Sequence, residues 1–207
     1  MRSLILSLAL VLPASSFAQP AYYRVTGVAA DDTLNVRAQP RAGSADIGDL
    51  PPDADGIEVM GTDASGKWGQ IIWQEANGWI AMRFLTPDAV QHVAGTALPA
   101  GLMCAGNEPF WSMQFSVNSA TYSDLGGAVY PMALQGARVA EGRANFPVQT
   151  GFTGADAASN ALIAPAACSD GMSDRTYPWR IDLLLTGGGA GRYLTGCCAL
   201  PLEIGSH

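Results

Sequence analysis

An adjacent pair of cysteines, Cys197-Cys198, constrains this chain more than any other feature, because it limits how the segment that carries it can fold. Two further cysteines, Cys104 and Cys168, lie upstream. A bridge between neighbours needs a strained ring, whereas on a β-strand the two side chains point to opposite faces. Each can then reach a different partner, with Cys198 on the buried face. The sequence predicts two disulfides and leaves open which pairs form.

Metal binding is the competing interpretation of four cysteines. Zinc sites combine C-x2-C pairs or closely spaced histidines. This chain has no C-x2-C pair and only two histidines, His92 and His207. We therefore expect no metal and no other cofactor.

The first eighteen residues have the pattern of a cleavable signal peptide. Arg2 is followed by an apolar run from Leu4 to Pro13, and Ser16-Phe17-Ala18 places small residues at the cleavage positions. The run is too short for a membrane span of about 20 residues. We expect a periplasmic or secreted protein without a lipid anchor or membrane insertion, in a compartment that favours disulfides over reactive thiols.

Charge limits the partners of the chain. The net charge is −7, and −8 without Arg2, and the excess of acidic residues extends over both halves. Lys and Arg form no cluster. Nucleic acids and anionic lipid surfaces are bound through such clusters, so we expect neither as a partner.

Three separated motifs organise the first part of the chain. Leu34-Asn35-Val36-Arg37 with Pro40 comes first, Trp68 follows in a β-like run, and Gly78-Trp79-Ile80 closes the series. Over residues 22–87 this pattern resembles a bacterial SH3 domain. The resemblance implies an SH3-like barrel at 19–87 that binds peptidoglycan peptides or another envelope protein, with Trp79 on a closing strand. We expect truncation of Trp79 to destabilise this domain.

The second part is also β-like. Residues 88–103 show no sustained period and predict a linker, interrupted by Gly95, Pro99 and Gly101. Residues 104–207 predict an antiparallel β-barrel or sandwich, with a hairpin of 179–186 and 192–200 around a glycine-rich turn and weak strands in 137–146. Gly106-Asn107-Glu108-Pro109-Phe110-Trp111 and Gly196-Cys197-Cys198 resemble motifs of an uncharacterised family of exported bacterial proteins. That resemblance implies no activity.

Candidate ligand-binding residues are Asn35, Arg37, Trp73 and Trp79. Asn35 and Arg37 share one face of an extended strand. The alternative for Arg37 is a structural role, in which it closes a loop by hydrogen bonds to carbonyls, and we favour it. Tryptophans of small barrels are mostly core residues, and Trp73, at the end of its run, is the one we expect to be most exposed.

Enzymatic chemistry finds little support in the sequence. A serine hydrolase needs a base beside its nucleophile, and the two histidines lie in the expected linker and at the end of the chain. Carboxylates that could hydrolyse a glycosidic bond are present, but no spacing selects a pair: Glu108, Asp170, Asp174 and Asp182. For 169–174 we expect a structured turn rather than a calcium loop.

The sequence therefore predicts an all-β, non-catalytic envelope protein that binds peptidoglycan peptides through its first domain. A protein-binding module such as an inhibitor of a basic lysozyme-type enzyme is the alternative, because an acidic surface speeds encounter with a basic partner. Hydrolysis of an envelope polymer by the second domain is the third hypothesis.

Overall fold

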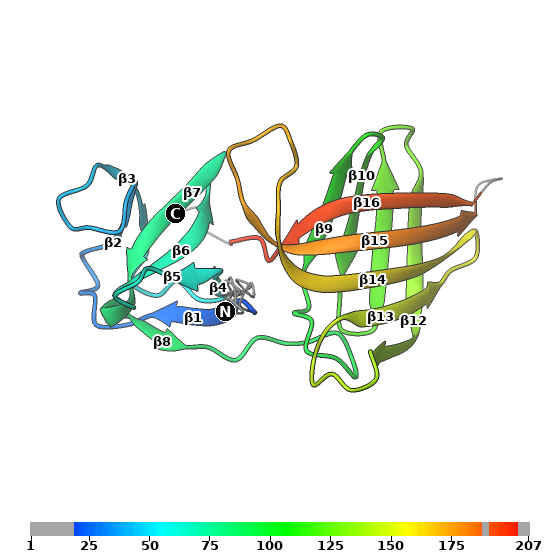
Figure 1. Cartoon of the computed structure of the whole chain (residues 1–207), viewed down its shortest axis with the longest axis horizontal. Helices are drawn as coiled ribbons and strands as arrows, with labels where there is room; N and C mark the ends of the chain where they lie inside the picture. The colour runs from blue at the N-terminus through cyan, green and yellow to red at the C-terminus, as the bar shows by residue number, and fades with distance from the viewer. Residues whose placement is uncertain (1–18, 188–190, 203–207) are drawn as a thin grey trace, which may run out of the picture.

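The computed structural model describes residues 19–187 and 191–202 and consists of two β domains in contact (Figure 1). The expected signal peptide, the centre of the glycine-rich turn and His207 lie outside the described residues. No helix in the described residues is long and apolar enough to cross a membrane.

The first domain is built from two small antiparallel sheets. One has the strand order β4-β1-β8 and the other β3-β2-β7-β6-β5. The strands are β1 (Ala21–Val25), β2 (Leu34–Arg37), β3 (Asp46–Leu50), β4 (Ile57–Val59), β5 (Gly61–Thr62), β6 (Trp68–Trp73), β7 (Ala76–Ala81) and β8 (Leu85–Pro87), with a 3-10 turn at Met82–Phe84.

Alternation of side chains builds the core between these sheets. On β6 every second residue is buried, and on β2 Leu34 and Val36 are buried while Asn35 and Arg37 lie on the outer face. Trp73 packs into this core against Gly48, where a Cβ atom would collide with the indole ring. Gly48 has a φ of 156°, so glycine suits this position for its backbone as well as for its size.

The second domain is a closed antiparallel barrel of eight strands, in the order β10-β11-β12-β13-β14-β15-β16-β9. The strands are β9 (Met103–Asn107), β10 (Phe110–Phe115), β11 (Ser119–Asp124), β12 (Val129–Val139), β13 (Val148–Thr153), β14 (Ala157–Cys168), β15 (Tyr177–Gly187) and β16 (Arg192–Ala199). Apolar side chains from all of these strands fill its interior. The prediction of a disulfide-containing β domain is confirmed, and closure makes it a barrel rather than a sandwich.

Two disulfides join the barrel strands as the sequence predicted. Cys104 of β9 pairs with Cys198 of β16 directly across the ladder, on the buried side. Cys197, on the opposite face, pairs with Cys168 at the end of β14. The connectivity that the sequence left open is therefore Cys104–Cys198 and Cys168–Cys197, which is typical of an oxidising compartment outside the cytoplasm.

Two expectations about the second half of the chain are wrong. The expected linker 88–103 is largely part of the barrel: Val93, Leu98 and Leu102 are fully buried in its core. The Gly101 amide donates to the Phe115 carbonyl at 2.7 Å. Burial of three apolar side chains stabilises the packing of this segment on the barrel, although its sequence has no strand or helix period. Of the weak strands expected in 137–146, only the end of β12 forms, and turns follow it.

Candidate functional site

The expected ligand-binding residues of the first strands are tied into the domain. The Asn35 side-chain amide donates to the Asp46 carboxylate. Arg37 donates to the Ser44 carbonyl at 3.3 Å and lies 3.4 Å from the same Asp46 carboxylate. The structure thus gives Arg37 the loop-closing role that we favoured. Its guanidinium remains partly exposed on the outer face of β2.

The two tryptophans exchange the roles that we expected for them. Trp73 is only 7% exposed, and its indole N–H donates to the Ile47 carbonyl at 2.9 Å, so the expectation of an exposed Trp73 is wrong. Trp79 is half-buried on the outer face, directly between Gln70 and Arg37 of the neighbouring strands. The inward residues of β7 are instead Gly78 and Ile80, because side chains alternate along the strand.

The outer face that carries Trp79 continues to the second domain. Asn77 lies two residues from Trp79 on the same side of β7. Its side chain accepts a hydrogen bond from the Thr176 amide at 2.8 Å and donates to the Thr176 carbonyl at 3.2 Å. The loop between β14 and β15 therefore docks against the β6–β7 hairpin (Figure 1).

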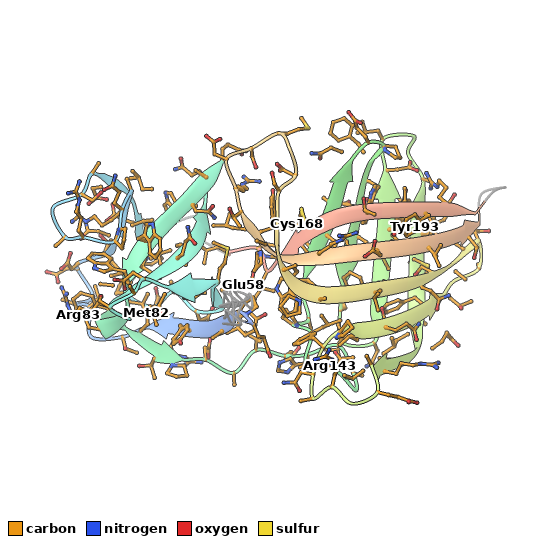
Figure 2. The ribbon with its side chains drawn as sticks, in the orientation of Figure 1. Glu58, Met82, Arg83, Arg143, Cys168 and Tyr193 are labelled. Atoms are coloured by element: carbon orange, nitrogen blue, oxygen red, sulfur yellow. A yellow bond between two sulfur atoms is a disulfide. The ribbon has the colours of Figure 1, made fainter. Side chains whose placement is uncertain are left out.

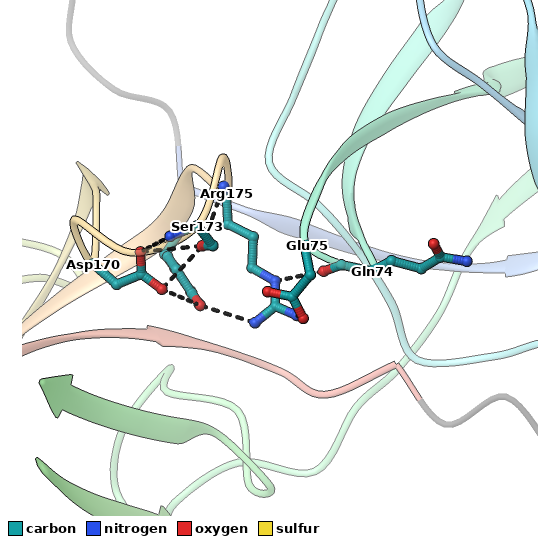
Figure 3. A network of polar contacts seen from close by, with 6 residues as sticks. Gln74, Glu75, Asp170, Ser173 and Arg175 are labelled. Atoms are coloured by element: carbon teal, nitrogen blue, oxygen red, sulfur yellow. Dashed lines mark hydrogen bonds and ion pairs between the residues drawn. The ribbon is translucent and has the colours of Figure 1, made fainter.

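Arg175 makes most of the remaining contacts of this loop (Figure 3). It donates to the Gln74 carbonyl, to the Tyr177 hydroxyl at 3.1 Å and to the Glu75 carboxylate at 2.8 Å. The Asp174 amide adds a bond to the Glu75 carbonyl at 3.1 Å. A planar guanidinium with several donors suits such a junction better than an ammonium group would.

Asp170 shapes the loop from within. Its carboxylate accepts hydrogen bonds from the Met172 and Ser173 amides at 3.0 and 2.9 Å, from the Ser173 hydroxyl and from the Tyr177 hydroxyl at 3.0 Å. Burial alone would raise the pKa of Asp170, but these bonds outweigh it and lower the pKa to about 2. The expected structured turn is thus present, and its first residues follow directly from the Cys168–Cys197 bridge.

A cleft of about 470 Å³ lies between the domains, within the size range of small-molecule sites. Its walls are largely apolar and come from β4 and β6 of the first domain and from β9 and the segment after β16 of the second. The polar residues that line it are Glu58, Asn107, Asp170, Arg175 and Tyr177.

Glu58 is a buried charged group at the junction between the two domains (Figure 2). It lies on β4 and is 8% exposed. Its Oε1 accepts from the Trp179 indole N–H at 2.8 Å and the Tyr22 hydroxyl at 3.2 Å, and its Oε2 accepts from the Leu200 amide at 2.8 Å. Burial raises the pKa of Glu58 to about 7, although all three bonds act in the opposite direction.

Tyr22 is a neutral donor in this arrangement. Its burial, and then the adjacent Glu58 carboxylate, raise the pKa of the Tyr22 hydroxyl well above its ordinary value. The hydroxyl therefore keeps its proton and remains available to Glu58 throughout the neutral range.

The carboxylates considered for hydrolysis are not brought together as a pair. Asp170 is committed to its loop, and Asp182 accepts hydrogen bonds from Arg180 and Tyr193 on the outer wall of the barrel. Asp174 and Glu108 are exposed at separate loops. In the described part of the chain, no group of three or more His, Cys, Asp or Glu side chains could hold a metal ion.

Sequence reasoning missed Glu58 and its partners Tyr22, Trp179 and Leu200. The sequence shows only that Glu58 is flanked by the apolar residues Ile57 and Val59. In the structure all three residues are buried. A carboxylate in such a run needs donors, and two of its three donors, Trp179 and Leu200, come from residues more than 120 positions away. The sequence does not show that proximity.

Comparison of the chain with known protein families, with curated proteins and with solved structures found no match.

Proposed function

We propose that this protein is a non-catalytic binding protein of the bacterial cell envelope that holds peptidoglycan peptides on the outer face of β2, β7 and β6. One observation carries the proposal: Arg37 and Trp79 are direct neighbours on this face, and Asn77, on the same side of β7, contacts the docked loop of the second domain. The half-buried Trp79 ring offers a stacking surface. Polar groups on either side suit the backbone of an extended peptide.

The charges along this face fit a peptide with ionised groups of both signs. The Arg37–Asp46 pair lies beside Trp79, and the Arg175–Glu75 pair lies at the junction with the second domain. From Trp79 to Ala76 at the start of β7 the distance is about 10 Å, at about 3.3 Å per residue, and Glu75 lies in the turn just before Ala76. A peptide of about four extended residues spans the same length. We expect affinity in the micromolar range or weaker, because a shallow face orders little ligand area.

Co-sedimentation of residues 19–207 with isolated sacculi tests the proposal. Both domains are needed in the sample, since a fragment of the first domain alone would leave Glu58 without its Trp179 and Leu200 donors. We expect the wild-type chain to sediment and Trp79→Ala to remain in the supernatant. Tyr193→Ala, which removes an aromatic ring that is 64% exposed on the barrel, is the matched control and should sediment like wild type. Equal sedimentation of all three proteins would contradict the proposal.

A second candidate is inhibition of a basic lysozyme-type enzyme by the barrel domain. It is favoured by an exposed apolar end of the barrel, where Phe110 and Leu125 are 45% and 82% exposed and line a depression beside Glu108. Such an acidic and aromatic loop fits insertion into the cleft of a basic enzyme. This candidate predicts that Phe110→Ala abolishes inhibition of lysozyme and that Trp79→Ala does not.

A further inference from the structure

Glu58 has one acceptor position to spare. An ionised carboxylate offers about four lone-pair sites, two on each oxygen. Oε1 uses both of its sites, for Trp179 and Tyr22, whereas Oε2 accepts only from the Leu200 amide. The side chain is also one of the residues that line the interdomain cleft. A donor group of a ligand in the cleft can therefore form a fourth hydrogen bond to the Glu58 carboxylate, at Oε2.

The charge balance of the cleft favours a cation as that donor. Among the lining residues that the structure describes, Glu58 and Asp170 are acidic and Arg175 is basic. The Arg175 charge is already offset by Glu75 at 2.8 Å. Glu58 has no basic partner in the described residues, and its three donors are neutral. A buried carboxylate without a counter-charge is a costly arrangement that a bound cation would relieve.

The rest of the cleft is apolar. Ile57, Ile72, Met103, Leu200 and Leu202 line it around Glu58. A hydrated metal ion would gain nothing from such walls, whereas a hydrocarbon chain would gain about 25 cal/mol for each Å² removed from water. The cleft therefore suits a ligand that combines a cationic group for Glu58 with a hydrocarbon chain for the apolar walls.

We propose that the cleft between the two domains binds a small molecule with a primary ammonium group on an aliphatic chain, in which the ammonium group donates to Oε2 of Glu58. The cleft adjoins the outer face of β2, β7 and β6, because Ile72 of β6 and Arg175 line it, but Glu58 lies on β4, outside that face. The proposal stands whether or not that face binds peptidoglycan peptides. Asp170 adds negative potential, but all its acceptor positions are used within its own loop.

The affinity of the cleft for a cation should increase with pH. The titratable and charged groups that face Glu58 are Tyr22 from β1 and, across the cleft, Asp170, Arg175 and Tyr177. Asp170, with its pKa of about 2, stays ionised above about pH 4, and Tyr22 stays neutral, so Glu58 is the group that changes charge near neutrality. A cation binds the ionised carboxylate, so its affinity should rise as the pH is raised through about 7.

Calorimetric titration of residues 19–207 with n-hexylamine, hexanol and hexanoate at about pH 8 tests the site. We expect hexylamine to bind about tenfold more tightly than hexanol and hexanoate to bind most weakly. The indole N–H of Trp179 and the amide of Leu200 should shift in NMR spectra on addition of the amine. Nα-acetyl-lysine methylamide, whose side-chain ammonium group is free, serves as a second amine. Comparison of its affinity with that of hexylamine shows whether a lysine-type side chain or a simple alkylamine binds better, and binding of either supports the proposal.

Glu58→Gln should abolish the preference for the amine over hexanol, whereas the matched control Glu141→Gln, on an exposed turn of the barrel, should keep it. If Glu58→Gln does not fold, the wild-type protein still decides: amine affinity should fall about tenfold from about pH 8 to about pH 5, and hexanol affinity should not. Hexanol or hexanoate binding as tightly as hexylamine, no saturable amine binding, or an unchanged preference in Glu58→Gln would each overturn the proposal. A negative result here leaves sedimentation with sacculi unaffected, so the two proposals fail separately.

Discussion

Glu58 couples ionisation to the folded state, because its surroundings stabilise the carboxylate less than water does. The donors from Trp179, Leu200 and Tyr22 offset part of the desolvation, and the pKa still rises from 4.5 to about 7. The folded protein therefore holds a proton at pH values where the unfolded chain has lost it. The stabilisation from this group is complete below about pH 4.5 and is lost as the pH rises through about 7.

We predict that the free energy of unfolding of the wild-type protein falls between about pH 4.5 and about pH 7 by an amount on the order of 3 kcal/mol relative to Glu58→Gln. Urea unfolding of both proteins across this range measures the difference. Asp170 does not interfere, because its lowered pKa confines its contribution to pH values below about 4. Parallel pH profiles of the two proteins would contradict the prediction.

Trp73 and Trp79 should differ in what their removal does. Trp73→Ala empties a core position under Gly48 and leaves the Ile47 carbonyl without its donor, so we expect a loss of about 3–5 kcal/mol. Trp79→Ala removes a half-buried cross-strand neighbour of Arg37 and should cost about 1 kcal/mol. Thermal melting of both variants compares them. A larger loss of stability for Trp79→Ala than for Trp73→Ala would mean that Trp79 is the core residue of the two.

The loop between β14 and β15 is the element that joins the two domains, and Asp170 holds its shape. We predict that Asp170→Asn speeds hydrogen exchange at the Met172, Ser173 and Thr176 amides, because the charge-assisted bonds from Met172 and Ser173 become weaker. The exposed Asp174 is the control, and Asp174→Asn should leave exchange at these amides unchanged. Equal effects of the two substitutions would mean that general charge, rather than the Asp170 bonds, orders the loop.

The two disulfides close loops of different length, and their removal should differ accordingly. The Cys104–Cys198 bridge spans 94 residues and the Cys168–Cys197 bridge spans 29. On the chain-entropy model, replacing the first pair by serine should cost about 5 kcal/mol and replacing the second about 4 kcal/mol. Denaturant unfolding of the two double variants measures both values. Non-reducing mass spectrometry should find both bridges and no alkylatable thiol in the exported protein.

The two domains share buried contacts, so the whole molecule should unfold as one unit. Trp179 is fully buried in the barrel core and donates directly to Glu58 of the first domain. We predict a single thermal transition that Trp73→Ala, a change within the first domain, shifts for the barrel as well. Near-ultraviolet circular dichroism and barrel-specific NMR signals should melt at the same temperature. Two separate transitions in the wild-type protein would show that the interface does not couple the domains.

Much of the fold was predictable from local patterns. β-like runs predict β6 and, around a glycine-rich turn, the hairpin of β15 and β16. Opposite faces at Cys197 and Cys198 predict two bridges, because successive side chains of a strand alternate whatever surrounds it. Residues 92–102 were not predictable in the same way. Their few apolar side chains have no period, and only packing against the barrel interior makes Val93, Leu98 and Leu102 core residues.

The sequence by itself determined the β class, the two disulfides and the outward position of Asn35 and Arg37, since each follows from bond geometry between near neighbours. Only the tertiary structure decided that Trp73 is buried, that Cys104 pairs with Cys198, and that Glu58 meets Trp179 and Leu200. These are contacts between residues 26 to 142 positions apart. Their geometry depends on how strands close into sheets and how two domains dock, which no short-range pattern encodes.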